Sequence, residues 1–240
     1  MENTSKTLIE NILISNSIEP KDDIFEKLRI YYEFLVESNE KFNLTSITNI
    51  DDVYIKHFAD SMLGANLYKH GATVCDIGTG AGFPGVVLKI IRPDLHITLV
   101  DSLNKRINFL NELIVKLNLD GVVAIHARAE DKFFKEKYLN TFDYVVARAV
   151  ASLPTLTEYC LPFVKVGGCF IAYKSDSVNT EINDALYSIK ILGGGAVKRN
   201  IVTLNDNINR SIVVVNKITP TSPKYPRGQN KPRLSPLLLK

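Results

Sequence analysis

The chain contains little cysteine and no long hydrophobic segment. Its three cysteines, Cys75, Cys160 and Cys169, form no C-x-x-C pair and lie in apolar stretches. We therefore expect buried, reduced thiols in a cytoplasmic protein, with no disulfide and no metal site. No apolar run approaches the roughly 18 residues that a membrane-spanning helix needs. The first 20 residues, which Glu2 and Glu10 interrupt, look like neither a signal peptide nor a transit peptide. These absences predict a protein that is not attached to a membrane.

Acidic residues are absent from the end of the chain. Residues 217–240 contain six basic residues and no acidic one, although the formal net charge of the whole chain is only +3. The remainder of the chain therefore carries a net charge of −3. Residues 219–240 also hold five of the ten prolines, which predicts an extended arm rather than a packed element. Such an arm could follow a phosphate backbone, with Tyr225 stacked on a base, or could simply keep the chain end soluble.

Hydrophobic periodicity predicts helices in residues 1–68. Ile24, Leu28, Tyr31 and Leu35 form one stripe of a helix, and a second helix is expected to begin after Asp51 as its N-cap. We interpret this segment as an N-terminal helical extension, followed by the main domain at residues 69–218 and the basic, proline-rich arm at 219–240.

From residue 69 onward, short apolar strands alternate with amphipathic helices, which is typical of a parallel sheet covered on both faces. A final pair of strands joined through Asn205-Asp206-Asn207 can add an antiparallel hairpin at the edge. The sequence thus predicts an α/β fold with a mostly parallel, seven-stranded sheet. The strands are expected at residues 73–77, 96–100, 122–126, 142–147, 169–173, 197–204 and 210–218.

A glycine-rich loop follows the first predicted strand. Gly78, Gly80 and Gly82 let the chain turn sharply and approach a ligand closely, at the sheet edge where such folds bind ligands. A dinucleotide-binding loop has its last glycine where this chain has Phe83. The carboxylate of Asp76 also suits the amino group of a methionine moiety better than a pyrophosphate. The loop therefore favours S-adenosylmethionine over NAD, and the lack of a G-K-[ST] motif excludes a Walker-type loop.

Carboxylates follow the next two predicted strands. Asp101 ends the second strand, where a carboxylate can accept both hydroxyls of a ribose. Ala129 and Glu130 follow the third strand, where they can meet an adenine ring. Two other interpretations remain open: Asp101 as the N-cap of the next helix, and Glu130 as a solvated loop residue.

The segment after the fourth predicted strand contains no candidate general base. It lacks the Asn/Asp-Pro-Pro-aromatic motif of exocyclic amine methylation and the Pro-Cys dipeptide of pyrimidine C5 methylation. A ring nitrogen with a free lone pair needs neither, because it can attack a sulfonium methyl group once the partners are positioned and water is excluded. We therefore predict no catalytic side chain. Arg148 could clamp the cofactor's carboxylate or an acceptor phosphate, or form a structural ion pair with Asp76 or Glu130. Lys174 is a second candidate for the clamp.

Six motifs in the chain resemble the RsmG family, once called glucose-inhibited division protein B, over nearly the whole length. They are Asn43-Leu44-Thr45, Lys56 to Ser61, Asp76 to Gly85, Asp101 to Arg106, Arg148 to Leu153 and Lys224 to Arg227. The resemblance implies a Rossmann-like class I methyltransferase that methylates N7 of a guanosine in bacterial 16S rRNA. It also implies S-adenosylmethionine contacts at Gly78, Phe83, Ala129, Glu130 and Arg148. Two places depart from the family pattern: Ser175, where glycine is common, and Gly228-Gln229-Asn230.

The predicted partner is 16S rRNA or the small ribosomal subunit, and the predicted state is a monomer. Three other functions remain open at this point. They are methylation of a small molecule or protein, NAD-dependent oxidoreduction, and RNA binding without catalysis. The predicted cofactor site contains Asp76, Gly78, Gly80, Phe83, Asp101, Ala129, Glu130 and Arg148.

Overall fold

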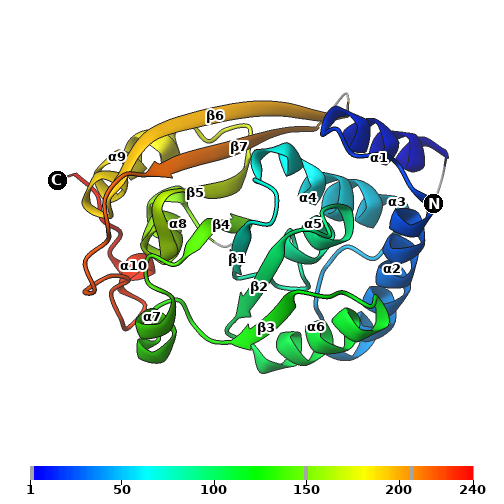
Figure 1. The fold of residues 1–240 in the computed structure, drawn as a ribbon, viewed down its shortest axis with the longest axis horizontal. Helices are drawn as coiled ribbons and strands as arrows, with labels where there is room; N and C mark the ends of the chain where they lie inside the picture. Colours follow the sequence, from blue (N-terminus) through cyan, green and yellow to red (C-terminus); the bar gives the residue numbers. More distant parts are fainter. Residues whose placement is uncertain (1–2, 149–150, 206–207, 240) are drawn as a thin grey trace.

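The structure is a computed structural model that describes residues 3–148, 151–205 and 208–239. Its strands form one sheet in the order β3-β2-β1-β4-β5-β7-β6 (Figure 1). Strands β1 to β5 run parallel to one another, and β7 is antiparallel to both β5 and β6. The order reverses between β1 and β4, which places a ligand-binding crevice at the carboxyl end of β1. The strands are β1 (Thr73–Ile77), β2 (His96–Asp101), β3 (Val122–His126), β4 (Phe142–Arg148), β5 (Val164–Ser175), β6 (Gly194–Asn205) and β7 (Ile208–Lys217).

Helices cover both faces of this sheet, as predicted, because successive strand residues point to opposite faces. Val74 and Val146 pack into one core with α1, α2, α5 and α6. Cys75 and Val145 pack into a second core with α7, α8 and α9. Figure 1 shows α1 to α6 together on one side and α7 to α10 on the other. The helices are α1 (Asn3–Ser15), α2 (Asp22–Phe42), α3 (Ile50–Val53), the π-helix η1 (Tyr54–Ala59), α4 (Asp60–Met62), η2 (Ala65–Leu67), α5 (Gly85–Ile91), α6 (Asn104–Lys116), α7 (Lys132–Tyr138), α8 (Leu153–Cys160), η3 (Leu161–Phe163), α9 (Asn179–Ile191) and α10 (Lys231–Leu234).

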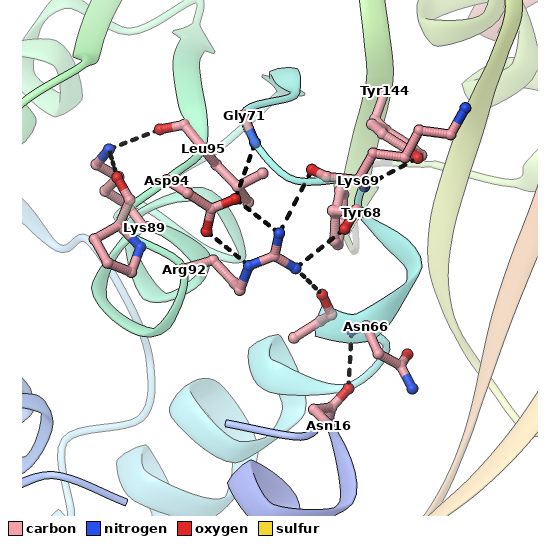
Figure 2. Close-up of polar contacts among 12 residues, drawn as sticks. Asn16, Asn66, Tyr68, Lys69, Gly71, Lys89, Arg92, Asp94, Leu95 and Tyr144 are labelled. Carbon is pink, nitrogen blue, oxygen red and sulfur yellow. Dashed lines mark hydrogen bonds and ion pairs between the residues drawn. The ribbon is translucent and has the colours of Figure 1, made fainter. Parts of the chain in front are cut away.

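Arg92, just after α5, fixes the segment that joins the N-terminal helices to β1. Its guanidinium donates to the carbonyl oxygens of Ala65 (2.8 Å) and Tyr68 (3.1 Å) and pairs with Asp94 at 2.8 Å. Asp94 in turn accepts a hydrogen bond from the backbone N–H of Gly71, as Figure 2 shows. The Arg92 guanidinium holds the pKa of the Asp94 carboxyl well below its usual range. This network sets where β1, and therefore the glycine loop, begins.

Several predicted boundaries were wrong. β5 begins at Val164 rather than near Cys169, because Val164 pairs with Phe142 across a β-bulge. The N-cap of the second helix is Asn49, whose side-chain oxygen accepts from the backbone N–H groups of Asp51 and Asp52. Asp51 therefore lies inside the helix. Ala149 and Val150 of the predicted Arg148 motif, and Asp206 and Asn207 of the predicted hairpin, lie outside the described residues.

The prediction of an unpacked C-terminal arm was also wrong. Tyr225 and Pro232 are buried, and Arg227 forms an ion pair with the buried Glu158 of α8. Prolines prevent strand pairing here but do not prevent packing of their rings. Within the described ranges, no helix is long and apolar enough to cross a membrane.

Candidate cofactor-binding site

The buried side chain of Asp76 forms hydrogen bonds with the glycine loop that follows β1. The Asp76 Oδ2 atom accepts hydrogen bonds from the Thr79 hydroxyl (2.7 Å) and from the Gly85 backbone N–H (2.8 Å). Its side chain is fully buried, and burial raises its pKa to about 6. Asp76 does not line the cavity described below. Oδ2 of Asp76 thus shapes the loop, whereas its buried Oδ1 has no hydrogen-bond partner within the described residues.

Two glycines of the loop face very different surroundings. A Cβ at Gly85 would lie 2.4 Å from Cδ2 of Leu99, so the loop packs tightly on the core there. A Cβ at Gly80, where φ is +63°, would meet nothing within 4 Å. The loop is therefore anchored at its far end and open to a ligand at Gly80.

A cavity of about 450 Å³ lies at the carboxyl ends of β1 to β4. This volume is within the usual range for small-molecule sites. Seven of the eight residues predicted to bind the cofactor line it, and only Asp76 does not. The seven are Gly78, Gly80, Phe83, Asp101, Ala129, Glu130 and Arg148.

The two cavity carboxylates already have protein partners. Asp101 accepts hydrogen bonds from the backbone N–H groups of Gly80 (3.0 Å) and Leu103 (2.9 Å), and it pairs with Arg106 at 3.1 Å. Asp101 thus connects the glycine loop to the start of α6. The N-cap residue of α6 is Leu103 and not Asp101, although Asp101 accepts from the Leu103 backbone N–H. Glu130 pairs with Arg128 at 2.9 Å, and its side chain is only 9% exposed. Glu130 is therefore not a solvated loop residue.

Arg148 forms a structural ion pair, but with neither of the predicted partners. Its Nη1 atom lies 2.8 Å from Oδ2 of Asp60, and its side chain is 10% exposed. The guanidinium carbon lies 4.9 Å from the ring centroid of Phe83, within the range of a cation–π interaction. Asp60 also pairs with Arg210 of β7 at 2.7 Å. The structure thus places Arg148 on the cavity wall, where its ion pair with Asp60 fixes its position.

Lys174, the second predicted clamp, does not line the cavity. Its ammonium group pairs with Glu181 at 2.7 Å and donates to the backbone oxygen of Ala151 at 3.1 Å. Glu181 also accepts from the Leu153 backbone N–H at the start of α8. Lys174 therefore supports the segment after β4 from outside the cavity.

Sequence reasoning assigned no role to His57, which lies on the cavity wall. Its ring stacks on Phe83 with the ring centroids 4.6 Å apart. Its Nδ1 lies 3.2 Å from Arg148 Nη2, and its Nε2 lies 2.9 Å from the Thr45 hydroxyl. A guanidinium can only donate, so we assign Nδ1 as the acceptor and place the ring proton on Nε2. Burial and the nearby Arg148 lower the pKa of His57 to about 4.

One feature of the sequence pointed to His57. It belongs to the Lys56 to Ser61 motif, which contributed to the family resemblance. It also lies in the π-helix η1, a rare helix type that often occurs at functional sites. What the motif alone could not show is that His57 contacts Phe83 and Arg148 together.

The reversal of strand order at β1, the glycine loop and the antiparallel β7 together define a Rossmann-like class I methyltransferase fold. A solved structure of a predicted O-methyltransferase from Agrobacterium tumefaciens has this fold. It is 12% identical, with a TM-score of 0.52, over 68% of this chain and 84% of that chain.

The family is shown by sequence comparison. The model of the GidB family, described as rRNA small subunit methyltransferase G, matches residues 24–213. Two relatives carry the name Ribosomal RNA small subunit methyltransferase G. The one from Macrococcus caseolyticus is 46% identical and the one from Lactobacillus acidophilus is 44% identical, each over 94% of this chain and 96% of its own length. The chain belongs to this family.

Proposed function

We propose that this protein transfers a methyl group from S-adenosylmethionine to N7 of a guanosine in 16S rRNA. The observation that carries the proposal is the cavity at the carboxyl ends of β1 to β4, in a chain that belongs to an rRNA methyltransferase family. The cavity lies at the reversal of strand order, where folds of this class bind their ligands.

The residues present fit S-adenosylmethionine. Gly80 leaves open space beside the loop, so a ligand can approach the backbone closely. Asp101 lines the cavity, and ribose hydroxyls would take the place of its two longest contacts, those from Arg106 at 3.1 and 3.4 Å. Ala129 and Glu130 would hold the adenine, and Phe83 and Arg148 would line the methionine end. When bound, S-adenosylmethionine supplies a methyl group already activated by its sulfonium.

The protein's own residues then need to orient the acceptor and exclude water, not to remove a proton. N7 of guanine carries a lone pair and no proton. The side chain best placed to act as a base is His57, but its only unprotonated nitrogen already accepts from Arg148. With its pKa lowered to about 4, His57 is neutral at pH 7 and unable to compete for a proton. This supports direct methyl transfer without a general base.

Methyl transfer from radiolabelled S-adenosylmethionine tests the proposal. The acceptors are small ribosomal subunits, and naked 16S rRNA, from cells that lack the protein. We expect label in the RNA as N7-methylguanosine, and a large loss of incorporation with Arg148→Ala. Label in protein or small molecules, with none in either RNA substrate, would support the alternative acceptors instead.

We also propose a cytoplasmic monomer that works without a bound metal ion. The free, buried thiols of Cys75 and Cys160 support a reducing compartment. Native mass spectrometry of the purified protein should give the mass of one chain with no metal adduct. A dimer mass or a retained metal would contradict this proposal.

A further inference from the structure

The C-terminal arm forms one wall of the cavity. Asn230 and Arg233 line it, facing residues from the carboxyl ends of the strands. The hydroxyl of Tyr159 in α8 donates to the side-chain oxygen of Asn230 at 3.1 Å. In Figure 1 the arm, in red, runs beside α7 and α8 and carries α10. A segment that the sequence placed outside the catalytic domain thus contributes directly to the site.

Arg227 fixes the part of the arm that contains Asn230 and Arg233. Arg227 contacts the fully buried carboxylate of Glu158 through its Nη2 (2.7 Å), its Nε (2.8 Å) and its backbone N–H (2.9 Å). The same Nη2 donates to the backbone oxygen of Ser235 at 2.7 Å. Residues 228–234 are therefore a loop clamped at both ends, and they hold Arg233 at the cavity.

Arg233 differs from the other arginines of the cavity. Each of the other three pairs with a carboxylate, whereas Arg233 has no ion pair and no side-chain hydrogen bond within the described part of the chain. Arg233 is also exposed. The paired arginines are Arg106 with Asp101 (3.1 Å), Arg128 with Glu130 (2.9 Å) and Arg148 with Asp60 (2.8 Å).

A groove of about 410 Å³ continues from the cavity along the arm. Residues 228–230 of the arm line it on one side, and Arg128, Glu130, Asp131 and Lys132 line it on the other. The groove and the cavity share Arg128, Glu130 and Asn230, so they adjoin. The side chain of Lys132 is 81% exposed, and its only ion pair in the described part of the chain is an exposed one with Glu136 at 3.8 Å. The charges that line the groove itself balance, two basic against two acidic. The arm segment 224–233 adds four basic residues and no acidic one, so the excess positive charge beside the groove comes from the arm.

We propose that Arg233 binds a phosphate of the single-stranded RNA substrate at the mouth of the cavity, and that the groove beside Lys132 takes the adjoining nucleotide. This inference rests on the proposed function. An unpaired guanidinium offers a planar, bidentate fork that suits a phosphate. Phosphate contacts of this kind fix the register of a nucleic acid and carry no sequence information. The arm therefore positions the RNA while the cavity selects the base.

Equilibrium binding of RNA at several salt concentrations tests this inference. The probe is a fluorescently labelled, unmodified 16S rRNA fragment that contains the acceptor guanosine. It is titrated with the full-length wild type, Arg233→Gln and Lys132→Gln. The control is Lys190→Gln, an exposed cation on α9 that lines neither the cavity nor the groove. Binding of S-adenosylhomocysteine is measured in parallel by calorimetry.

Each test variant should lose about fourfold in RNA affinity at about 0.15 M salt, and the slope of log K against log salt should become shallower by about 0.7, as expected for one lost phosphate contact on a single strand. Arg233→Lys should recover part of the loss. Affinity for S-adenosylhomocysteine should stay within about twofold of the wild type, and the control should match the wild type throughout.

Unchanged RNA affinity and slope in Arg233→Gln would overturn the inference, as would a wild type that does not bind the fragment. Weakened S-adenosylhomocysteine binding with unchanged RNA binding would assign Arg233 to the cofactor's carboxylate instead. RNA binding does not require methyl transfer. A wild type that binds RNA but transfers no methyl group would therefore defeat the proposed function and leave this inference standing.

Discussion

Asp60 is the residue at the site whose removal should destabilise the protein most. Its carboxylate lies between two guanidinium groups, 2.8 Å from Arg148 and 2.7 Å from Arg210. The side chain of Asp60 is 7% exposed, that of Arg148 10% and that of Arg210 27%. Asp60→Ala would leave the two arginine charges without their partner, one of them nearly out of contact with water.

Removing one partner of a buried ion pair costs about 3–5 kcal/mol. The Arg210 contact contributes less, since water can reach that guanidinium. We therefore expect Asp60→Ala to lower the free energy of unfolding by about 3–4 kcal/mol in urea titrations. Asp60→Asn keeps the shape and one acceptor oxygen, so it should lose less, about 2 kcal/mol. Both variants should weaken S-adenosylhomocysteine binding, because Arg148 loses the group that holds it on the cavity wall.

The matched control is Asp23→Ala, which breaks an exposed ion pair with Lys27 on α2. Exposed pairs contribute less than about 1 kcal/mol, so this variant should remain close to the wild type in stability and in ligand affinity. A loss below about 1 kcal/mol in Asp60→Ala, with unchanged S-adenosylhomocysteine affinity, would refute the reasoning. It would mean that Arg148 keeps its position without the carboxylate.

Other consequences of the structure can be measured on purified protein. The pKa of His57 falls from 6.5 to about 4 on folding, so between these values the unfolded chain holds a proton that the folded chain lacks. The contribution of His57 to stability is complete above about pH 6.5 and is lost as the pH falls toward about 4. Urea titrations should thus show that, between about pH 7 and pH 4.5, the free energy of unfolding falls by about 2 kcal/mol more in the wild type than in His57→Gln. An equal fall in the two proteins would contradict this. Gly85→Ala should cost about 1–3 kcal/mol by overpacking, whereas Gly80→Ala should cost only about 1 kcal/mol but weaken S-adenosylhomocysteine binding. Arg227→Ala leaves Glu158 buried without its partner and should cost about 3 kcal/mol. It should also speed tryptic cleavage within the arm, which mass spectrometry of timed digests can detect; wild-type cleavage rates would argue against the anchor.

Elements with a strong hydrophobic period could be predicted from the sequence, and elements defined by a partner could not. The alternation at Val74 and Cys75 marks a strand covered on both faces, and β1 is that strand. The early start of β5 depends on the pairing of Val164 with Phe142, which no local pattern shows. Helix α7 was not predicted because Phe134 is its single buried residue, too little to produce a helical stripe.

The site residues likewise divide into those that local patterns predict and those whose place depends on a distant partner. Residues on the loops after β1, β2 and β3 could be placed at one sheet edge because parallel strands bring their carboxyl ends together. The partner of Arg148 could not, because Asp60 lies 88 positions earlier in the chain and reaches Arg148 only through the packing of η1 and α4. Asn230 and Arg233 were missed for a related reason. The arm's composition indicates solubility or RNA binding. Its place at the cavity depends on contacts with distant residues, such as those of Arg227 with Glu158 and of Asn230 with Tyr159.

The most direct test of the proposed function is to map N7-methylguanosine in 16S rRNA from cells with and without this protein, by borohydride reduction and aniline cleavage. The function predicts one cleavage site that is present in the first RNA, absent from the second and restored by a plasmid-borne wild-type copy but not by Arg148→Ala. Identical cleavage patterns in the two RNAs would contradict it.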